Sequence, residues 1–96
     1  MEWGKGMVRR AARRDTNEPE IIEALRAVGA TVQSLDERGV PDLVVGFRQS
    51  TYLLEVKTAK GKLTKDQVVW HAAWKGQVAV VRTVEEALAV IGAEVE

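Results

Sequence analysis

The stretch GVPDLVVGFRQSTYLLEVK, residues 39–57, decides the fold that we expect for this chain. Residues 43–47 form an apolar, strand-like run, and a polar turn leads from it into a second strand over residues 51–56. A hairpin of this kind brings Asp42, at the start of the first strand, close to Glu55, at the end of the second. Two converging carboxylates offer the hard oxygen ligands that Mg²⁺ and Mn²⁺ prefer.

Lys57 adds a cation to this carboxylate pair. It follows Glu55 by two residues, so both side chains project from the same face of a strand. An acid pair with a lysine beside it is the minimal equipment for metal-assisted hydrolysis of a phosphodiester. Each part alone has an ordinary alternative, because Pro-Asp is usual in turns and Glu-x-Lys is usual in exposed ion pairs. The combination favours a site, since both acids flank apolar strands at a spacing that a hairpin closes.

The length and composition predict one small globular domain with a single modest core. The chain has 96 residues, of which 46% are hydrophobic and 29% charged. It contains no cysteine, which excludes disulfides and thiolate metal sites, and its single histidine, His71, excludes a multi-histidine zinc centre within one chain. No apolar run approaches the roughly 20 residues that span a bilayer, and the start of the chain has no apolar signal core. We therefore expect a cytoplasmic protein without a membrane partner.

Charge is distributed unevenly along the chain. Residues 1–14 contain five basic side chains against Glu2 alone, giving +4, so residues 15–96 carry −4 in a chain of zero net charge. A basic arm on an acidic domain suggests a polyanionic partner, and a solubilising tail is the alternative interpretation. A second group of lysines follows the carboxylate hairpin directly, which fits nucleic acid better than an acidic protein. The DNA contacts that we predict are Arg9, Arg10, Arg13, Arg14, Lys60, Lys62 and Lys65.

Periodicity and capping residues predict the element order αβββαβα. Residues 15–17 offer N-cap side chains for the first helix, with Pro19 in its first turn and Gly29 at its end. Thr64 to Gln67 match a capping box at the start of the second helix. The other elements that we expect are strands over 31–35, 43–47, 51–56 and 77–81 and a last helix over 84–91, which Thr83 caps and Gly92 ends. The strand over 77–81 is nearly all apolar, which predicts a strand that is central in the sheet or buried on both faces.

The first helix points to a third acid. At about 100° per residue, Glu18 falls on the apolar face of this helix, whereas Glu20 and Glu23 point away from it. If that face packs on the sheet, Glu18 lies at the sheet-facing end, near Asp42 and Glu55. The alternative is that Glu18 is a favourable acid at a helix N-terminus or the cap residue itself. The apolar face consists of Ile21, Ile22, Leu25 and Val28.

The second helix, which runs to about Lys75, predicts an interaction surface. It is apolar nearly all round, since it contains Val68, Val69, Trp70, Ala72, Ala73 and Trp74. One face must meet the sheet, and the rest would be exposed in so small a domain unless a partner covers it. We expect a second copy of the chain there, because two-fold pairing is the commonest arrangement. The alternative is that both tryptophans fill the core. His71 is interpreted as a packing or interface residue rather than a metal ligand.

These features together resemble the PD-(D/E)xK nuclease superfamily, and most closely its small VRR-NUC domains, particularly the stand-alone versions common in phages. The archaeal Holliday-junction resolvases are a more distant likeness. The resemblance covers about residues 15–92, and nothing in the family pattern assigns residues 1–14. The matching residues are Glu18, Gly39-Val40-Pro41-Asp42, Glu55-Val56-Lys57, Leu63-Thr64-Lys65-Asp66-Gln67 and Val78-Ala79-Val80-Val81-Arg82.

The resemblance implies an α/β fold with a restriction-endonuclease-like αβββαβ(α) core, a mixed central sheet and a metal site at the splayed edge of that sheet. In this scheme residues 1–14 are a basic arm and residues 15–96 are a single nuclease domain. Asp42 and Glu55 would bind Mg²⁺ or Mn²⁺ directly, with the Val56 carbonyl as a further ligand.

The same resemblance implies roles for three more residues. Glu18 would act on the metal directly or through water. Lys57 would orient or activate the attacking water, or stabilise charge on the phosphate. Gln67 matches a glutamine that family members place near the site.

We therefore expect a Mg²⁺- or Mn²⁺-dependent DNA endonuclease, acting as a homodimer on branched or otherwise structured DNA such as a four-way junction. The alternative from another class is a non-catalytic DNA-binding module that keeps the fold for docking, and the intact acid–acid–lysine set argues against it. A third interpretation, an enzyme for small nucleotides, lacks a Gly-rich phosphate loop.

Overall fold

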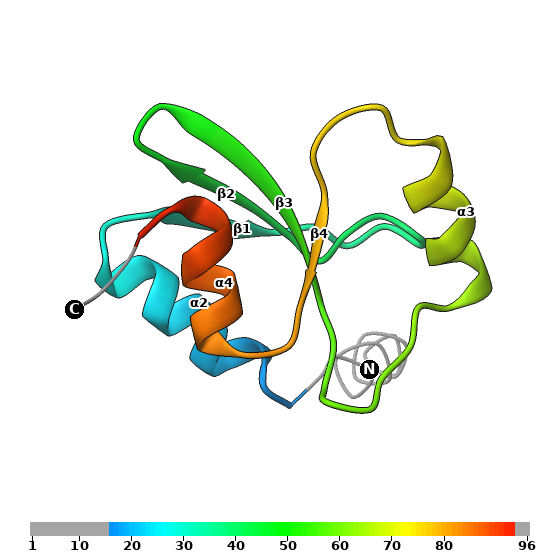
Figure 1. Ribbon diagram of the computed structural model, residues 1–96, viewed down its shortest axis with the longest axis horizontal. Helices are drawn as coiled ribbons and strands as arrows, with labels where there is room; N and C mark the ends of the chain where they lie inside the picture. Colours follow the sequence, from blue (N-terminus) through cyan, green and yellow to red (C-terminus); the bar gives the residue numbers. More distant parts are fainter. Residues whose placement is uncertain (1–15, 94–96) are drawn as a thin grey trace, which may run out of the picture.

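The computed structural model describes residues 16–93, which contain three helices and four strands in the predicted order (Figure 1). The arm over residues 1–14, with the predicted DNA contacts Arg9, Arg10, Arg13 and Arg14, lies outside the described residues. Within the described residues, no helix is long and apolar enough to cross a membrane. The elements are α2 (Glu18–Ala27), β1 (Thr31–Ser34), β2 (Leu43–Phe47), β3 (Ser50–Val56), α3 (Lys65–Ala73), β4 (Ala79–Val81) and α4 (Val84–Ile91).

The four strands form one mixed sheet in the order β1-β2-β3-β4. The first three strands are antiparallel neighbours, and β4 pairs with β3 in parallel. The mixed sheet and the order αβββαβα are therefore as predicted. A tight turn joins β2 to β3, with positive φ at both Arg48 and Gln49, as type I′ hairpin turns require. The register places Leu43 opposite Leu54, so Asp42 lies opposite the end of β3.

The hydrophobic core lies on one face of the sheet, beneath α2 and α4. Figure 1 shows these two helices side by side, and they contact each other and the strands. Side chains that alternate along the inner strands point into this core. The fully buried apolar side chains are Ile21, Leu25, Leu43, Val45, Leu54, Val56 and Val81, with Ala87, Ile91 and Ala93 from the end of the chain also buried. The stripe predicted for the first helix is thus confirmed at Ile21 and Leu25.

The prediction for the last strand was wrong in its start and in its place in the sheet. Ordered strand pairing starts at Ala79, and β4 lies at the edge of the sheet rather than at its centre. Val81 is fully buried on the helix-covered face, whereas Val80 points the other way and is 37% exposed. A short apolar run does not reveal how many neighbours it has. Here β4 has one strand beside it and a helix layer on one side.

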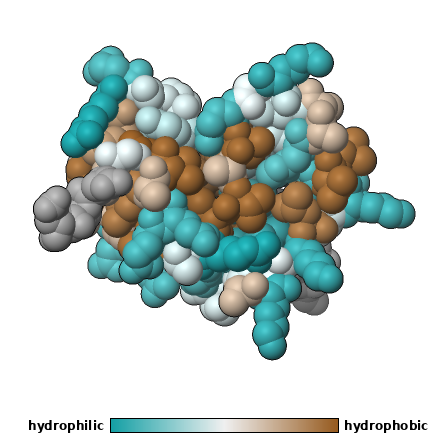
Figure 2. Space-filling model, viewed as in Figure 1, coloured by the Kyte–Doolittle hydropathy of each residue, from teal (hydrophilic) through white to brown (hydrophobic). Residues whose placement is uncertain are grey.

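Helix α3 takes a different position from α2 and α4. It connects β3 to β4 and stands on the opposite side of the sheet, apart from the core (Figure 1). No residue of α3 is buried, so neither tryptophan fills the core. Trp70 and Trp74 instead stack on each other, with ring centroids 4.7 Å apart. Val68 and Val69 are exposed, and Figure 2 shows apolar surface over this part of the molecule.

The predicted helix ends are largely confirmed. Thr64 closes the capping box of α3 with Gln67, and Thr83 caps α4. Gly92 ends α4 in the left-handed conformation that glycine adopts without steric penalty. The exception is the start of α2. Asn17 is the cap residue, but its side chain makes no cap hydrogen bond.

Candidate active site

Glu55 and Lys57 lie on the face of the sheet that α2 and α4 leave uncovered. The parallel register pairs Glu55 with Val80 and Val56 with Val81. Val56 and Val81 are buried in the core, so Glu55 points to the other face, and Lys57 follows it two residues later. The predicted common face of Glu55 and Lys57 is therefore confirmed. Glu55 is only 1% exposed although it is an acid.

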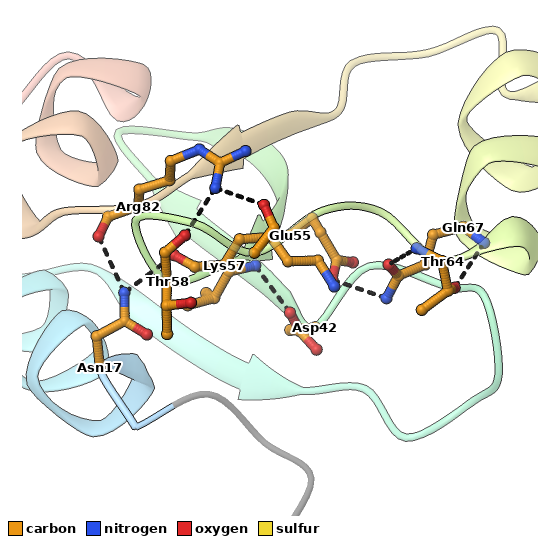
Figure 3. Close-up of polar contacts among 10 residues, drawn as sticks. Asn17, Asp42, Glu55, Lys57, Thr58, Thr64, Gln67 and Arg82 are labelled. Carbon is orange, nitrogen blue, oxygen red and sulfur yellow. Dashed lines mark hydrogen bonds and ion pairs between the residues drawn. The ribbon is translucent and has the colours of Figure 1, made fainter.

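The hairpin brings Asp42 to the end of β3, as its spacing predicts. Asp42 Oδ2 accepts a hydrogen bond from the Val56 N–H at 2.8 Å (Figure 3). This contact fixes the carboxylate across two strands at the point where the pairing of β2 with β3 begins. It also brings the Asp42 carboxylate close enough to Glu55 for the two acids to interact.

Burial and the Asp42 carboxylate raise the pKa of Glu55 from 4.5 to about 8. Loss of hydration is the larger cause, and repulsion by Asp42 and a hydrogen bond with it come next. The ammonium group of Lys57 acts in the opposite direction. Glu55 Oε1 is buried and has no hydrogen-bond partner among residues 16–93. A buried carboxylate oxygen without a donor is costly, and a cation would both satisfy it and favour the charged acid.

Two side chains contact the other oxygen of Glu55. Lys57 Nζ lies 3.5 Å from Glu55 Oε2, and the lysine side chain is 12% exposed. Gln67 Nε2 donates to the same oxygen at 2.9 Å, while Gln67 Oε1 accepts the Thr64 N–H at 2.9 Å. Gln67 therefore closes the capping box of α3 and contacts the acid at the same time (Figure 3). It lies beside Glu55, in the position where the family resemblance expects a glutamine.

Glu18 is the first residue of α2 and is buried, at 4% exposed. Its position on the inward face agrees with the helical stripe. Within residues 16–93, however, no three acidic, histidine or cysteine side chains gather closely enough to hold a metal ion together. Glu18, Asp42 and Glu55 thus do not form one such group in this part of the chain, and the participation of Glu18, directly or through water, stays a prediction.

Asn17 and Arg82 hold the chain segment that leaves β3, and sequence reasoning missed both roles. Asn17 Nδ2 donates to the Lys57 carbonyl at 3.1 Å and to the Arg82 carbonyl at 2.9 Å. Arg82 Nη1 donates to the carbonyls of Thr58 at 2.7 Å and Gly61 at 2.8 Å. These contacts tie α2, β3 and β4 together beside Lys57 (Figure 3). An asparagine in a cap position gave no sign that its amide would reach two other strands.

Gly39 is the first residue of the stretch that decided the fold, and the structure shows why a glycine stands there. It has φ of +82°, and a side chain there would meet the Asp66 carbonyl at 3.2 Å. Arg38 Nη1 lies 3.4 Å from Asp66 Oδ2 next to this contact. The loop before Asp42 therefore supports the first turn of α3, from which Gln67 reaches Glu55.

The predicted lysine cluster lies on the connection that leaves the site. Lys60 and Lys62 are exposed on the loop between β3 and α3, and Lys65 is exposed at the first residue of the helix. This connection starts at Lys57 and reaches Gln67 in the first turn of α3, and both of these residues contact Glu55. The three lysines therefore lie on a segment that is held to the buried acid at each end.

The αβββαβα order and the mixed four-strand sheet match the fold of the VRR-NUC nucleases. In this chain the paired acids and the lysine lie at the end of the central hairpin. A solved structure described as a VRR_NUC domain matches this chain with a TM-score of 0.62 and 27% sequence identity. The match covers 80% of this chain and 96% of that chain. The predicted resemblance and fold class are thus confirmed. The sequence matches no family model and no curated protein.

Proposed function

We propose that this protein is a divalent-metal-dependent nuclease that hydrolyses DNA phosphodiester bonds. The observation that supports this most directly is Glu55. It is a buried acid with one oxygen unpaired within the described part of the chain, next to the Asp42 carboxylate and the Lys57 ammonium group. Nothing in the packing of a small domain calls for such a residue, because a buried acid beside another acid destabilises the fold. The similarity to the VRR-NUC fold supports the same proposal.

The residues present fit Mg²⁺ or Mn²⁺. Asp42 and Glu55 supply the carboxylate oxygens that hard cations prefer, and we propose the Val56 carbonyl as a third ligand. Glu18 would complete the set through water. A bound cation supplies Lewis acidity, polarising a phosphoryl oxygen and lowering the pKa of water. The fit rests on Glu55 Oε1, whose lone pairs have no donor among the described residues.

The chain's own groups divide the remaining work. Lys57 lies within 3.5 Å of Glu55 and is largely covered, so its ammonium group stabilises the negative charge that grows on the phosphate, or orients the attacking water. Gln67 holds one oxygen of Glu55, and the other oxygen has no hydrogen-bond partner among the described residues. Asn17 fixes the Lys57 backbone through its carbonyl. Each contact limits how far the reacting groups can shift.

DNA would be held by basic side chains on either side of the acids. Lys60, Lys62 and Lys65 are exposed beside the site, and Arg9, Arg10, Arg13 and Arg14 are proposed to add contacts from the arm. Removing one phosphate contact lowers the slope of log K against log salt by roughly 0.9 on duplex DNA. Deleting residues 1–14 should therefore flatten the salt dependence without changing the rate at saturating DNA. An unchanged slope would assign the arm to solubility.

Cleavage assays test the function itself. Supercoiled, linear and four-way-junction DNA are incubated with Mg²⁺ or Mn²⁺, alongside a Glu55→Gln variant that keeps the shape of the side chain. We expect metal-dependent cutting by the wild type, with branched DNA preferred, and no cutting by the variant. DNA binding without cutting under all conditions would instead support the non-catalytic docking module.

We propose a homodimer as the working form. The exposed apolar residues of α3 and β4 support this, because Val68, Val69, Trp74 and Val80 are between 37% and 67% exposed. Such surface is usually covered by a partner. A second copy would present two sites to two DNA strands, which suits a branched substrate.

A further inference from the structure

Hydrogen bonds link helix α3 to β3 at its start and, through the residues that follow it, at its end. At its start, Gln67 donates to Glu55. At its end, Trp74 Nε1 donates to the Gln77 carbonyl at 3.0 Å. The Gln77 amide in turn bonds the backbone of Leu53, accepting its N–H at 2.7 Å and donating to its carbonyl at 3.3 Å. Gln67 reaches Glu55 on the open face of β3, whereas the Gln77 amide bonds backbone groups at the edge of the same strand, so α3 is linked to β3 at two points.

His71 occupies this middle part of the helix. It lies four residues after Gln67, so the two share a face of α3. Trp70 contacts the imidazole edge-on, with centroids 5.8 Å apart and planes at 72°. The stack of Trp70 on Trp74 continues this contact. His71 therefore lies on the side of α3 that carries Gln67, with Trp70 in contact with its ring.

One nitrogen of this imidazole is left without a partner. His71 Nε2 is buried and makes no hydrogen bond with the described part of the chain. Burial and the neighbouring charge of Lys57 both lower the pKa of His71, burial being the larger cause. The ring is thus neutral at neutral pH and has an acceptor to offer. Lys57 is the charged group near it, and the Lys57 ammonium group has three donors and contacts Glu55 at the long distance of 3.5 Å.

We propose that His71 is a positioning residue for Lys57, whose ammonium group donates to His71 Nε2 when Glu55 is occupied by its cation. This inference rests on the proposed nuclease function and adds a residue to it. A cation bound at Glu55 repels the neighbouring ammonium group of Lys57, and the lysine then needs another acceptor to stay in place. The expectation from sequence, that His71 serves packing or an interface, assigns it no such role.

Two substitutions separate positioning from packing in the cleavage assay. His71→Gln keeps an acceptor oxygen near the position of Nε2, whereas His71→Phe keeps the ring and its contact with Trp70 but has no acceptor. We expect His71→Phe to lower kcat about 10- to 100-fold with unchanged KM for DNA, as loss of an orienting partner does. His71→Gln should stay within a few-fold of wild type. Equal loss in both variants, together with a lower melting temperature, would assign His71 to packing and overturn the proposal.

A second measurement needs no catalysis. His71 is the single histidine of the chain, so its imidazole ¹⁵N resonances are assigned without ambiguity. We expect the Nδ1–H tautomer, and a shift of the Nε2 resonance when Lys57→Met removes the donor in the presence of Mg²⁺. Lys62→Met is the matched control and should leave the resonance in place. An Nε2 resonance indifferent to both variants would overturn the inference. Absence of cleavage by the wild type with a Lys57-dependent Nε2 shift would instead reject the nuclease function alone.

Discussion

Gln67 joins the start of α3 to the buried acid: its side-chain oxygen accepts the Thr64 N–H, and its nitrogen lies 2.9 Å from Glu55 Oε2. The oxygen of one amide group thereby caps the helix, and its nitrogen contacts the buried acid. The Gln67 side chain therefore has two separable roles, one at the helix start and one at Glu55.

Gln67→Glu separates these two duties. Glutamate keeps an oxygen for the Thr64 N–H, so the helix start is preserved, but it replaces the donor at Glu55 with a second acid. We expect activity to fall at least about 10-fold and the pKa of Glu55 to rise further, with unchanged helical circular dichroism. Thr64→Ala is the control, because it weakens the cap and leaves the Gln67–Glu55 contact. Equal loss in both variants would mean that Gln67 acts only through the helix start.

Glu55 should make the metal-free protein less stable as pH rises. Its pKa is raised from 4.5 to about 8, so between these values the folded state holds a proton that the unfolded state has released. The free energy of unfolding therefore falls by about 1.4 kcal/mol per pH unit in this window and levels off above about pH 8. Glu55→Gln has no such proton, so its advantage over wild type should grow with pH. Urea denaturation at several pH values measures it, and parallel pH profiles would contradict the buried, uncharged acid.

Metal affinity should follow the two carboxylates and not the lysine. Asp42→Ala and Glu55→Ala each remove a proposed ligand, and we expect Mn²⁺ affinity to fall by more than about 100-fold, beyond the effect of losing an outer partner. Lys57→Ala should abolish turnover and leave Mn²⁺ binding nearly unchanged. In the wild type, affinity should rise about tenfold per pH unit below about pH 8, since Glu55 must release its proton. Calorimetry that gave all three variants wild-type affinity would refute the site.

Substitutions at Glu18 and Glu20 test whether Glu18 is the third acid of the site. Both lie in the first turn of α2, but Glu18 is buried and Glu20 is exposed. Glu18→Gln keeps size and helix contacts, and we expect it to reduce cleavage at least about 10-fold, the loss usual for an outer-sphere partner. Glu20→Gln should leave cleavage unchanged, because it alters charge at the same helix end without facing the sheet. Comparable rates in the two variants would remove Glu18 from the site.

Val69→Glu tests the homodimer without disturbing the fold. Val69 is 67% exposed, so in a monomer the change should alter stability by no more than about 0.5 kcal/mol. In a dimer built on α3 it buries a charge, and we expect dissociation at micromolar concentration. Ala89→Glu, at an exposed position of α4, is the control and should sediment like the wild type. A wild-type protein that sediments as a monomer would contradict the homodimer.

The sequence was informative where one residue and its neighbours decide the outcome. Thr64, Thr83 and Gly92 mark helix ends through local chemistry, and each was found in place. The acids at the two ends of the hairpin met as expected, because strand spacing and a tight turn leave little choice of register. Local pattern and tertiary structure agree in these segments.

The sequence was uninformative where the outcome depends on partners far along the chain. Val80 was expected to be buried, but no pattern within β4 tells that its outer neighbour is missing. The Asn17 side chain could have closed its own helix, and its competing partners are carbonyls 40 and 65 residues away. Gly39 is typical of a turn, but its close approach to Asp66 depends on the position of α3 in the fold. Such contacts follow from the assembled fold and carry no local signature.

The attachment of α3 has a consequence for how this domain opens. Its ends are held by side-chain hydrogen bonds, worth about 0.5–1.5 kcal/mol each, whereas each core side chain beneath α2 and α4 contributes about 1.5–3 kcal/mol through burial. The amides of α3 should therefore exchange with solvent hydrogen through a local opening, at lower free energy than those of β2 and β3. Because Gln67 and His71 both belong to α3, the same opening would uncover Glu55 and Lys57 while the core stays folded, giving a long DNA strand a way into and out of the site.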